Sequence, residues 1–171
     1  EIAPYPFTTK KPEVGVMDYH GVKIQIVEIP AIIRNFNKTN LGPSYLSIIR
    51  TADLIILMFN SPEEKLMLDK ELSEINAEIL IYNNQENLPD EIWKRLNLIK
   101  IYTKQPGKEK DYPPIAFKKG ATVRWLAERV HKDFIKRFKY ARVWGSTRFE
   151  GQNVGLDYVL KDNDVVELHV S

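Results

Sequence analysis

The first half of the chain alternates short apolar runs with polar and amphipathic segments. Alternating apolar and polar residues predict two strands, at residues 14–19 and 22–29, and Gly21 allows the positive φ of a tight hairpin turn between them. Residues 54–59 are apolar on both faces, as in a parallel strand buried between helices, and residues 78–82 predict the next strand.

Helices are predicted between these strands. A helix begins near Pro43 and extends to about Arg50, after a polar loop at residues 35–42. A second begins at Ser61-Pro62-Glu63-Glu64, where serine caps the helix and the acids lie at the positive end of its dipole. A short third helix is predicted at residues 89–96. This alternation indicates an α/β fold with an open, mainly parallel sheet.

From residue 98 the order of elements changes. Two strands are followed by one helix and two more strands, with a short helical turn before the last strand. The predicted ranges are strand 98–103, strand 115–117, helix 122–138, strand 140–144, helical turn 155–160 and strand 164–170. The change predicts two domains, residues 1–95 and 96–171.

The composition excludes several classes of protein. A hydrophobic content of 43% is that of a globular protein rather than a disordered one. No apolar run approaches the roughly 20 residues that span a bilayer, and the acidic, proline-containing start does not have the pattern of a signal peptide. The absence of cysteine excludes disulfides and thiolate metal sites, and it fits a cytoplasmic protein.

The charges are unevenly distributed. Residues 1–95 carry more acidic than basic side chains, whereas residues 118–148 alone contain ten basic and two acidic ones. This segment predicts a polyanionic partner, and a solvated basic face is the alternative. Trp125, Val130 and Phe134 are spaced for one buried helix face and predict a core, so the charged residues are the expected contacts with phosphates. The candidate nucleic-acid-binding residues are Lys132, Lys136, Arg137, Lys139 and Arg142.

The chain contains no phosphate-binding loop of the G-x-x-x-x-G-K-[ST] type. None of its eight glycines begins that motif, whose backbone amides and lysine hold nucleotide phosphates. No Ser/His/Asp arrangement and no metal-ligand spacing is apparent either. The catalytic residues are therefore unknown from the sequence.

Several segments nevertheless resemble one family. The stretch Val130–Asp157, with residues 98–104 and 117–123, resembles the TGS domain that ends the developmentally regulated GTP-binding proteins (DRG) and some Obg relatives. Pro6-Phe7-Thr8-Thr9 and Glu28-Ile29-Pro30-Ala31-Ile32-Ile33 resemble parts of their GTPase domain. The resemblance implies an incomplete P-loop GTPase-like open sheet in residues 1–95, followed by a ubiquitin-like β-grasp domain in residues 96–171.

The resemblance assigns roles near the start of the chain. Thr8 and Thr9 match switch I threonines, and it implies that Thr9 ligates Mg²⁺. Glu28 and Ala31 lie where the family has Asp-x-Pro-Gly, whose aspartate holds the Mg²⁺ shell and whose glycine amide meets the γ-phosphate. Glu28 keeps the charge on a longer stem, and Ala31 keeps the amide without the backbone freedom of glycine. On residues alone, Thr8 and Thr9 are an ordinary β-forming pair.

A third nucleotide motif is altered. Tyr82-Asn83-Asn84-Gln85-Glu86 lies where the family has Asn-Lys-x-Asp, whose aspartate pairs with the edge of guanine. Asn83 is retained, whereas Asn84 replaces the lysine and Glu86 the aspartate. The resemblance implies nucleotide contacts by Asn83 and Glu86. On the residues alone, a polar loop after a strand is the better interpretation.

Two hypotheses for the function follow. The first is a GTP-binding protein of the DRG/Obg type that acts on ribosomes or RNA, with GTP and Mg²⁺ as cofactors if a P-loop lies upstream, and with a regulatory protein as a further possible partner. The second is a nonenzymatic RNA- or ribosome-binding TGS protein with a degenerate GTPase domain. The altered motifs favour the second, and the order of family landmarks favours the first.

Overall fold

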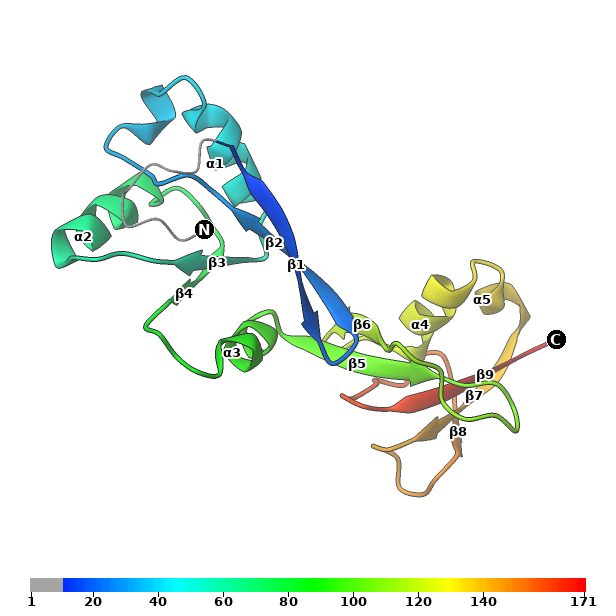
Figure 1. The fold of residues 1–171 in the computed structure, drawn as a ribbon. Coiled ribbons are helices and arrows are strands. Elements are labelled where there is room, and N and C mark those ends of the chain that lie inside the picture. The colour runs from blue at the N-terminus through cyan, green and yellow to red at the C-terminus, as the bar shows by residue number, and fades with distance from the viewer. Residues whose placement is uncertain (1–10) are drawn as a thin grey trace. The chain divides into compact units, whose positions relative to one another are not determined.

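The computed structural model describes residues 11–171, which fall into two compact units (Figure 1). One unit contains the chain up to Met17 together with Lys23–Leu96, and the other contains Asp18–Val22 together with Asn97–Ser171. Each unit has its own cluster of buried hydrophobic residues. Independent folding of residues 96–171 stays a prediction.

The predicted hairpin is present. β1 (Glu13–Tyr19) and β2 (Val22–Glu28) pair in a two-stranded sheet. His20 and Gly21 have φ of 50° and 88°, which is the left-handed backbone of a tight two-residue hairpin turn. The Gly21 amide donates to Asp18 Oδ1 at 2.9 Å and closes the turn. Glycine is needed at this position because φ is positive there.

The first unit continues with alternating helices and strands (Figure 1). Strands β3 and β4 pair in parallel with Leu54 opposite Glu78, and α1 and α2 supply most of the core that packs beside them. The elements are η1 (Phe36–Lys38), α1 (Gly42–Arg50), β3 (Leu54–Leu57), α2 (Pro62–Glu71), β4 (Glu78–Ile81) and α3 (Leu88–Arg95). The buried residues are Phe36, Tyr45, Leu46, Ile49, Leu57, Leu68 and Leu72.

The start of α2 follows the predicted capping chemistry. Ser61 Oγ accepts a hydrogen bond from the Glu64 amide at 3.2 Å, and the Glu64 carboxylate accepts one from the Asn60 amide at 2.8 Å. The Glu63 backbone amide, and then the Ser61 hydroxyl, lower the pKa of the exposed Glu63 carboxyl. These bonds satisfy amide donors that the first helical turn leaves without partners.

The α/β class with open sheets and a parallel pair is confirmed. The sheet of the first unit nevertheless lies in two pieces, β1–β2 and β3–β4, where one sheet was expected. No strand of the described part of this unit pairs with both pieces. The loop predicted at residues 35–42 contains the short helix η1, because Glu71 accepts the amides of Asn35 and Phe36 at 2.8 and 3.1 Å and fixes the turn.

The second unit is a five-stranded mixed sheet with one helix packed on it (Figure 1). Its strand order is β6-β5-β9-β7-β8, in which β9 pairs parallel with β5 and antiparallel with β7. The elements are β5 (Leu98–Thr103), β6 (Ile115–Lys118), α4 (Val123–Val130), α5 (Phe134–Arg137), β7 (Phe138–Trp144), β8 (Gln152–Val154) and β9 (Val165–Val170). The first strand, β5, and the last strand, β9, lie side by side in the middle of the sheet, and a helix crosses one face. This arrangement confirms the predicted β-grasp.

The two faces of this sheet differ. Alternating residues on the central strands, with Val123, Leu126 and Ala127 of α4, form a core in which most side chains are fully buried. The side chains between them point to the other face, because neighbouring residues of a strand point to opposite sides. The strand residues of the core are Ile99, Ile101, Ala141, Val143 and Val166.

The helix predicted over residues 122–138 is two helices. His131 ends α4 in an extended conformation, with φ of −161° and ψ of 132°, and the chain turns before α5 begins at Phe134. The predicted buried face is also wrong: Trp125 is 49% exposed and Val130 is 41% exposed. The sheet contacts α4 through Val123, Leu126 and Ala127, a face rotated from the one that the aromatic spacing suggested.

In place of the helical turn predicted at residues 155–160, the structure has one hydrogen-bonded turn, in which the Tyr158 amide donates to the Gly155 carbonyl at 3.3 Å, followed by a segment that pairs with residues 121–122. Val159 forms a β-bridge with Thr122, and the Leu160 amide donates to the Ala121 carbonyl at 2.9 Å. Leu160 therefore enters the core from an extended segment. The preceding strand β8 was not predicted, since its three residues are too short to show a period.

Asp164 fixes the start of β9. Its buried carboxylate, 1% exposed, accepts the amide and the hydroxyl of Ser146, each at 2.8 Å, and the Lys161 amide at 2.8 Å. Gly145 lies so close that a Cβ there would be 2.7 Å from Asp164 Oδ1. Asp164 therefore joins the loop after β7 to the turn before β9.

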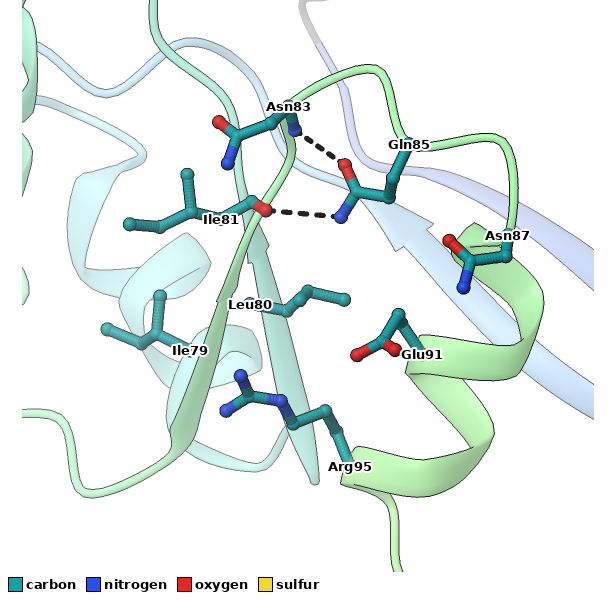
Figure 2. A pocket seen from close by; sticks show the side chains of 8 residues that line it. All are labelled: Ile79, Leu80, Ile81, Asn83, Gln85, Asn87, Glu91 and Arg95. Atoms are coloured by element: carbon teal, nitrogen blue, oxygen red, sulfur yellow. Dashed lines mark hydrogen bonds between the residues drawn. The ribbon is translucent and has the colours of Figure 1, made fainter.

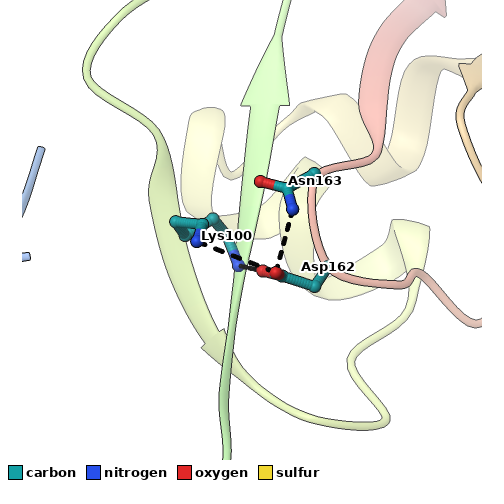
Figure 3. Close-up of polar contacts among 3 residues, drawn as sticks. All are labelled: Lys100, Asp162 and Asn163. Carbon is teal, nitrogen blue, oxygen red and sulfur yellow. Dashed lines mark hydrogen bonds and ion pairs between the residues drawn. The ribbon is translucent and has the colours of Figure 1, made fainter. Parts of the chain in front are cut away.

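A second carboxylate joins the same turn to β5 (Figure 3). Asp162 Oδ1 accepts the Lys100 amide at 2.7 Å, and Asp162 Oδ2 lies 3.7 Å from Lys100 Nζ. Asn163, which has a φ of 68°, donates its backbone amide to the Lys100 carbonyl at 2.8 Å. The turn is therefore held to the sheet at both ends.

Candidate functional site

The positions matched to the magnesium and phosphate motifs lie at the end of β2. Glu28 is the last residue of that strand and Ala31 follows in the next loop, and both are exposed. Thr8 and Thr9 lie outside the described residues. Within residues 11–171 no group of three His, Cys, Asp or Glu side chains is arranged to hold a metal ion. The role of Glu28 toward Mg²⁺ stays a prediction.

The loop matched to the guanine motif is closed by its own side chain (Figure 2). Gln85 Oε1 accepts the Asn83 amide at 2.6 Å, and Gln85 Nε2 donates to the Ile81 carbonyl at 3.3 Å. Asn84, in the lysine position, has a left-handed φ of 55°. Gln85 was not singled out from the sequence, although a side chain that bonds its own loop is typical of such turns.

A pocket of about 440 Å³ lies beside this loop, between β4 and α3 (Figure 2). Asn83 lines it, whereas Glu86 is exposed and does not. The structure therefore does not bring the two predicted guanine contacts into one pocket. The lining residues are Ile79, Leu80, Ile81, Asn83, Gln85, Asn87, Glu91 and Arg95.

The five candidate RNA contacts are all exposed. Lys132 lies in the turn between α4 and α5, Lys136 and Arg137 lie in the last turn of α5, and Lys139 follows at the start of β7. The β7–β9 register shifts between Phe138 and Tyr140, so Lys139 lies in a bulge. We call Lys132, Lys136, Arg137 and Lys139 the basic segment.

The two arginines, Arg137 and Arg142, have surroundings that differ from those of the three lysines. Arg137 is held by Ser171, whose amide donates to the Arg137 carbonyl at 2.9 Å and whose carbonyl accepts from Arg137 Nε. Arg142 lies between the buried Ala141 and Val143, so its side chain points away from the α4 side of the sheet. The structure therefore separates Arg142 from the basic segment.

Aromatic and charged side chains share the sheet face opposite α4, which we call the open face. Tyr140 stacks on His169 with ring centroids 4.3 Å apart, and His169 Nε2 lies 2.6 Å from Glu167 Oε1. Glu167 is 3% exposed, and its other oxygen lies 3.9 Å from Lys104 Nζ. The open face contains Tyr102, Lys104, Tyr140, Arg142, Trp144, Glu167 and His169.

Lysines cover two of these rings. Lys104 Nζ lies 4.5 Å from the ring centroid of Trp144, and Lys110 Nζ lies 4.2 Å from that of Tyr102. None of these residues was predicted as an RNA contact from the sequence. The sequence did contain a signal for Tyr102. Successive side chains of a strand point to opposite faces, so in strand 98–103 Tyr102 lies on the face opposite to that of Ile99 and Ile101.

No helix in residues 11–171 is both long and apolar enough to cross a membrane.

Comparison with known proteins identifies the two parts of the chain. The family model of 50S ribosome-binding GTPases matches residues 1–88, and that of the TGS domain matches residues 99–170. A GTP-binding protein of Methanocaldococcus jannaschii is 44% identical over 87 residues, which is 50% of this chain and 22% of that protein. A solved GTP-binding protein from Pyrococcus horikoshii OT3 is 21% identical, covers 69% of this chain and 45% of its own, and has a TM-score of 0.44.

A longer alignment reaches a named relative. Developmentally-regulated GTP-binding protein 2 of Homo sapiens is 24% identical over 274 residues, which cover 98% of this chain and 75% of the human protein. Because that alignment is longer than the 171-residue chain, the human protein has segments with no counterpart here. The chain belongs to the family of 50S ribosome-binding GTPases, with a TGS domain after its GTPase part and developmentally regulated GTP-binding proteins among its relatives.

Proposed function

We propose that this chain is the RNA-contacting part of a DRG-type GTP-binding protein and binds ribosomal RNA through its second unit. The observation that carries the proposal is the exposure of the whole basic segment on that unit. No ion pair among the described residues involves Lys132, Lys136 or Lys139, so their charges are available to phosphates. The proposal places the protein in the cytoplasm, where ribosomes are found.

Electrostatics support RNA over a neutral partner. Ten basic and two acidic side chains lie within residues 118–148. Lysines that neutralise phosphates release bound counterions, and this release drives association with nucleic acids. The acidic first unit would be repelled from RNA, so binding is oriented toward the second unit.

Binding to ribosomes tests the proposal. The full chain is centrifuged through a sucrose cushion with purified ribosomal subunits at low and at high salt. We expect it to sediment with the subunits at low salt and to be released as salt rises. A chain that stays in the supernatant at low salt would contradict the proposal. Release by added protein-free RNA would separate RNA contacts from contacts with ribosomal proteins.

GTP and Mg²⁺ enter the proposal through the family and depend on a P-loop outside this chain. The alternative is a nonenzymatic RNA-binding protein, which the Gln85-closed loop and the position of Glu86 outside the pocket favour. A regulatory protein partner remains part of the proposal for the whole protein.

We expect this chain alone to bind GTP weakly or not at all, because it lacks the phosphate cradle and its guanine loop is altered. A fluorescent GTP analogue titrated with Mg²⁺ measures this, and an ATP analogue is the control for base preference. Tight, guanine-selective binding that Glu28→Ala abolishes would contradict the prediction and would restore Glu28 as a ligand.

A further inference from the structure

We propose that unpaired RNA nucleotides bind across the open face, with bases stacked on Trp144 and Tyr102. This inference rests on the proposed function, since it specifies where RNA lies and in which form. The open face is on the opposite side of the sheet from α4, whereas the basic segment extends from the turn after α4 through α5 to the start of β7. The chain would thus contact RNA at two separate places.

The two rings are arranged as stacking platforms. Tyr102 and Trp144 lie on the same face of the sheet, since both are paired in register with Val165 of the strand between them. Each is partly exposed and is covered by a lysine ammonium rather than by packed apolar side chains. A base stacks on an aromatic ring more strongly than an exposed ammonium does, so an incoming base can displace the lysine.

The displaced lysines would then meet the phosphates beside the stacked bases. Lys104 and Lys110 lie next to the rings, and Arg142 is exposed and has no ion pair among the described residues. The buried carboxylate of Glu167 is occupied by His169 and lies near Lys104, so it leaves Arg142 available. Three cations beside two rings match the alternation of base and phosphate along a single strand.

The carboxylates near this face do not reverse its charge. Asp162 is paired with Lys100, and Asp111 accepts a hydrogen bond from the Thr103 hydroxyl at 2.7 Å. Lys100 is largely buried and lies 5.4 Å from the Tyr19 ring, so it is not counted among the phosphate contacts.

The rim of the platform is rigid. Thr147 Oγ1 lies 3.0 Å from the Val143 carbonyl oxygen and 3.0 Å from that of Phe149, and its one hydroxyl proton is donated to one or the other. Ser146 is anchored on Asp164. Gly151 packs so closely on Trp144 that a Cβ would lie 3.1 Å from the indole ring. The indole is therefore fixed before RNA arrives, which lowers the entropy cost of binding.

The ring faces favour unpaired over paired RNA. In a duplex the bases are stacked on one another, and recognition is by shape and by backbone contacts, so a flat aromatic platform has no base to receive. Unpaired bases can leave their own stack and use every ring face without regard to sequence.

The experiment measures fluorescence anisotropy of a labelled single-stranded RNA and of its duplex with the full chain. The test variants are Trp144→Leu and Tyr102→Leu. The matched control is Trp125→Leu, the same change at a tryptophan that is 49% exposed on α4. Each test variant is expected to weaken single-strand binding by about tenfold with an unchanged salt slope. The control is expected to bind like the unchanged protein.

Thermal unfolding checks that each variant is folded. If Trp144→Leu does not fold, Arg142→Gln, at an exposed residue of the same face, provides a second test. This variant is expected to lower the salt slope by about 0.7, as for one lost phosphate contact on a single strand.

The outcomes separate this inference from the proposed function. The inference would be overturned if the test variants bound single-stranded RNA as tightly as the unchanged protein does. It would also be overturned if the unchanged protein bound the duplex more tightly than the single strand. If charge reversal in the basic segment still weakens binding in that case, the proposed function stands and RNA lies on the other side. No RNA binding by the unchanged protein would overturn both.

Discussion

Glutamate in place of Lys132, Lys136 and Lys139 is expected to weaken RNA binding by the full chain by about a hundredfold at low salt. All three side chains are exposed and belong to one short segment from the turn before α5 to the first residues of β7. Reversal removes three phosphate contacts and adds repulsion at the same positions. Fluorescence anisotropy with a labelled RNA measures the change.

The control has the same change in charge on the other unit. Lys38, Lys70 and Lys94 are exposed there, and their triple replacement by glutamate alters the net charge equally. If RNA recognition is local, this control keeps most of its affinity. Equal losses in the two triple variants would show that only total charge matters. Exposed substitutions usually change stability by less than about 0.5 kcal/mol each, so both proteins should remain folded.

Asp164→Ala is expected to lower the free energy of unfolding by about 3 kcal/mol. The carboxylate is buried and accepts three hydrogen bonds, from the amide and the hydroxyl of Ser146 and from the Lys161 amide. Alanine leaves the part-buried amide and hydroxyl of Ser146 and the Lys161 amide without this acceptor, and it frees the loop after β7 from the turn before β9. Urea unfolding, followed by circular dichroism, measures the loss.

Asp157→Ala is the matched control for this prediction. Asp157 pairs with Arg124 at 3.0 Å, but its side chain is 88% exposed. An exposed ion pair contributes about 0.5 kcal/mol or less. Similar effects of the two alanine substitutions would contradict the assignment of Asp164 as the buried joint of the second unit.

Local patterns predicted most of the elements. Ser61-Pro62-Glu63-Glu64 predicted the start of α2 because capping depends on neighbouring residues, and Gly21 predicted the hairpin turn for the same reason. The strand–strand–helix–strand–strand order of the second half, with the family resemblance, led to the β-grasp. Boundaries shifted by a few residues, as for β3, which ends at Leu57 rather than residue 59.

The errors came from tertiary structure. Helical spacing of aromatic residues suggested that Trp125 is buried, but the sheet selects the face of α4 that contains Val123, Leu126 and Ala127. Helix 122–138 ends early because the chain must turn to place β7 between β8 and β9. Nothing local marks the bridge of Val159 to Thr122, which is formed between distant segments.

The candidate sites were only partly predictable. Basic residues are visible by composition, and their exposure agrees with the expectation. The open face was missed because Tyr102, Trp144 and His169 come from three strands that are far apart in the sequence. Their shared side follows only from the pairing of β9 between β5 and β7. Gln85 closes the loop of the altered guanine motif through bonds that no motif describes.

The most direct test of RNA binding through the second unit is the salt dependence of affinity for one single-stranded RNA. The logarithm of the association constant is plotted against the logarithm of salt concentration for the unchanged chain and for the Lys132, Lys136 and Lys139 triple variant. A steep line for the unchanged chain is expected, and a slope smaller by about two for the variant, because each phosphate contact on a single strand contributes about 0.7. Identical slopes and identical affinities for the two proteins would contradict RNA binding through the basic segment.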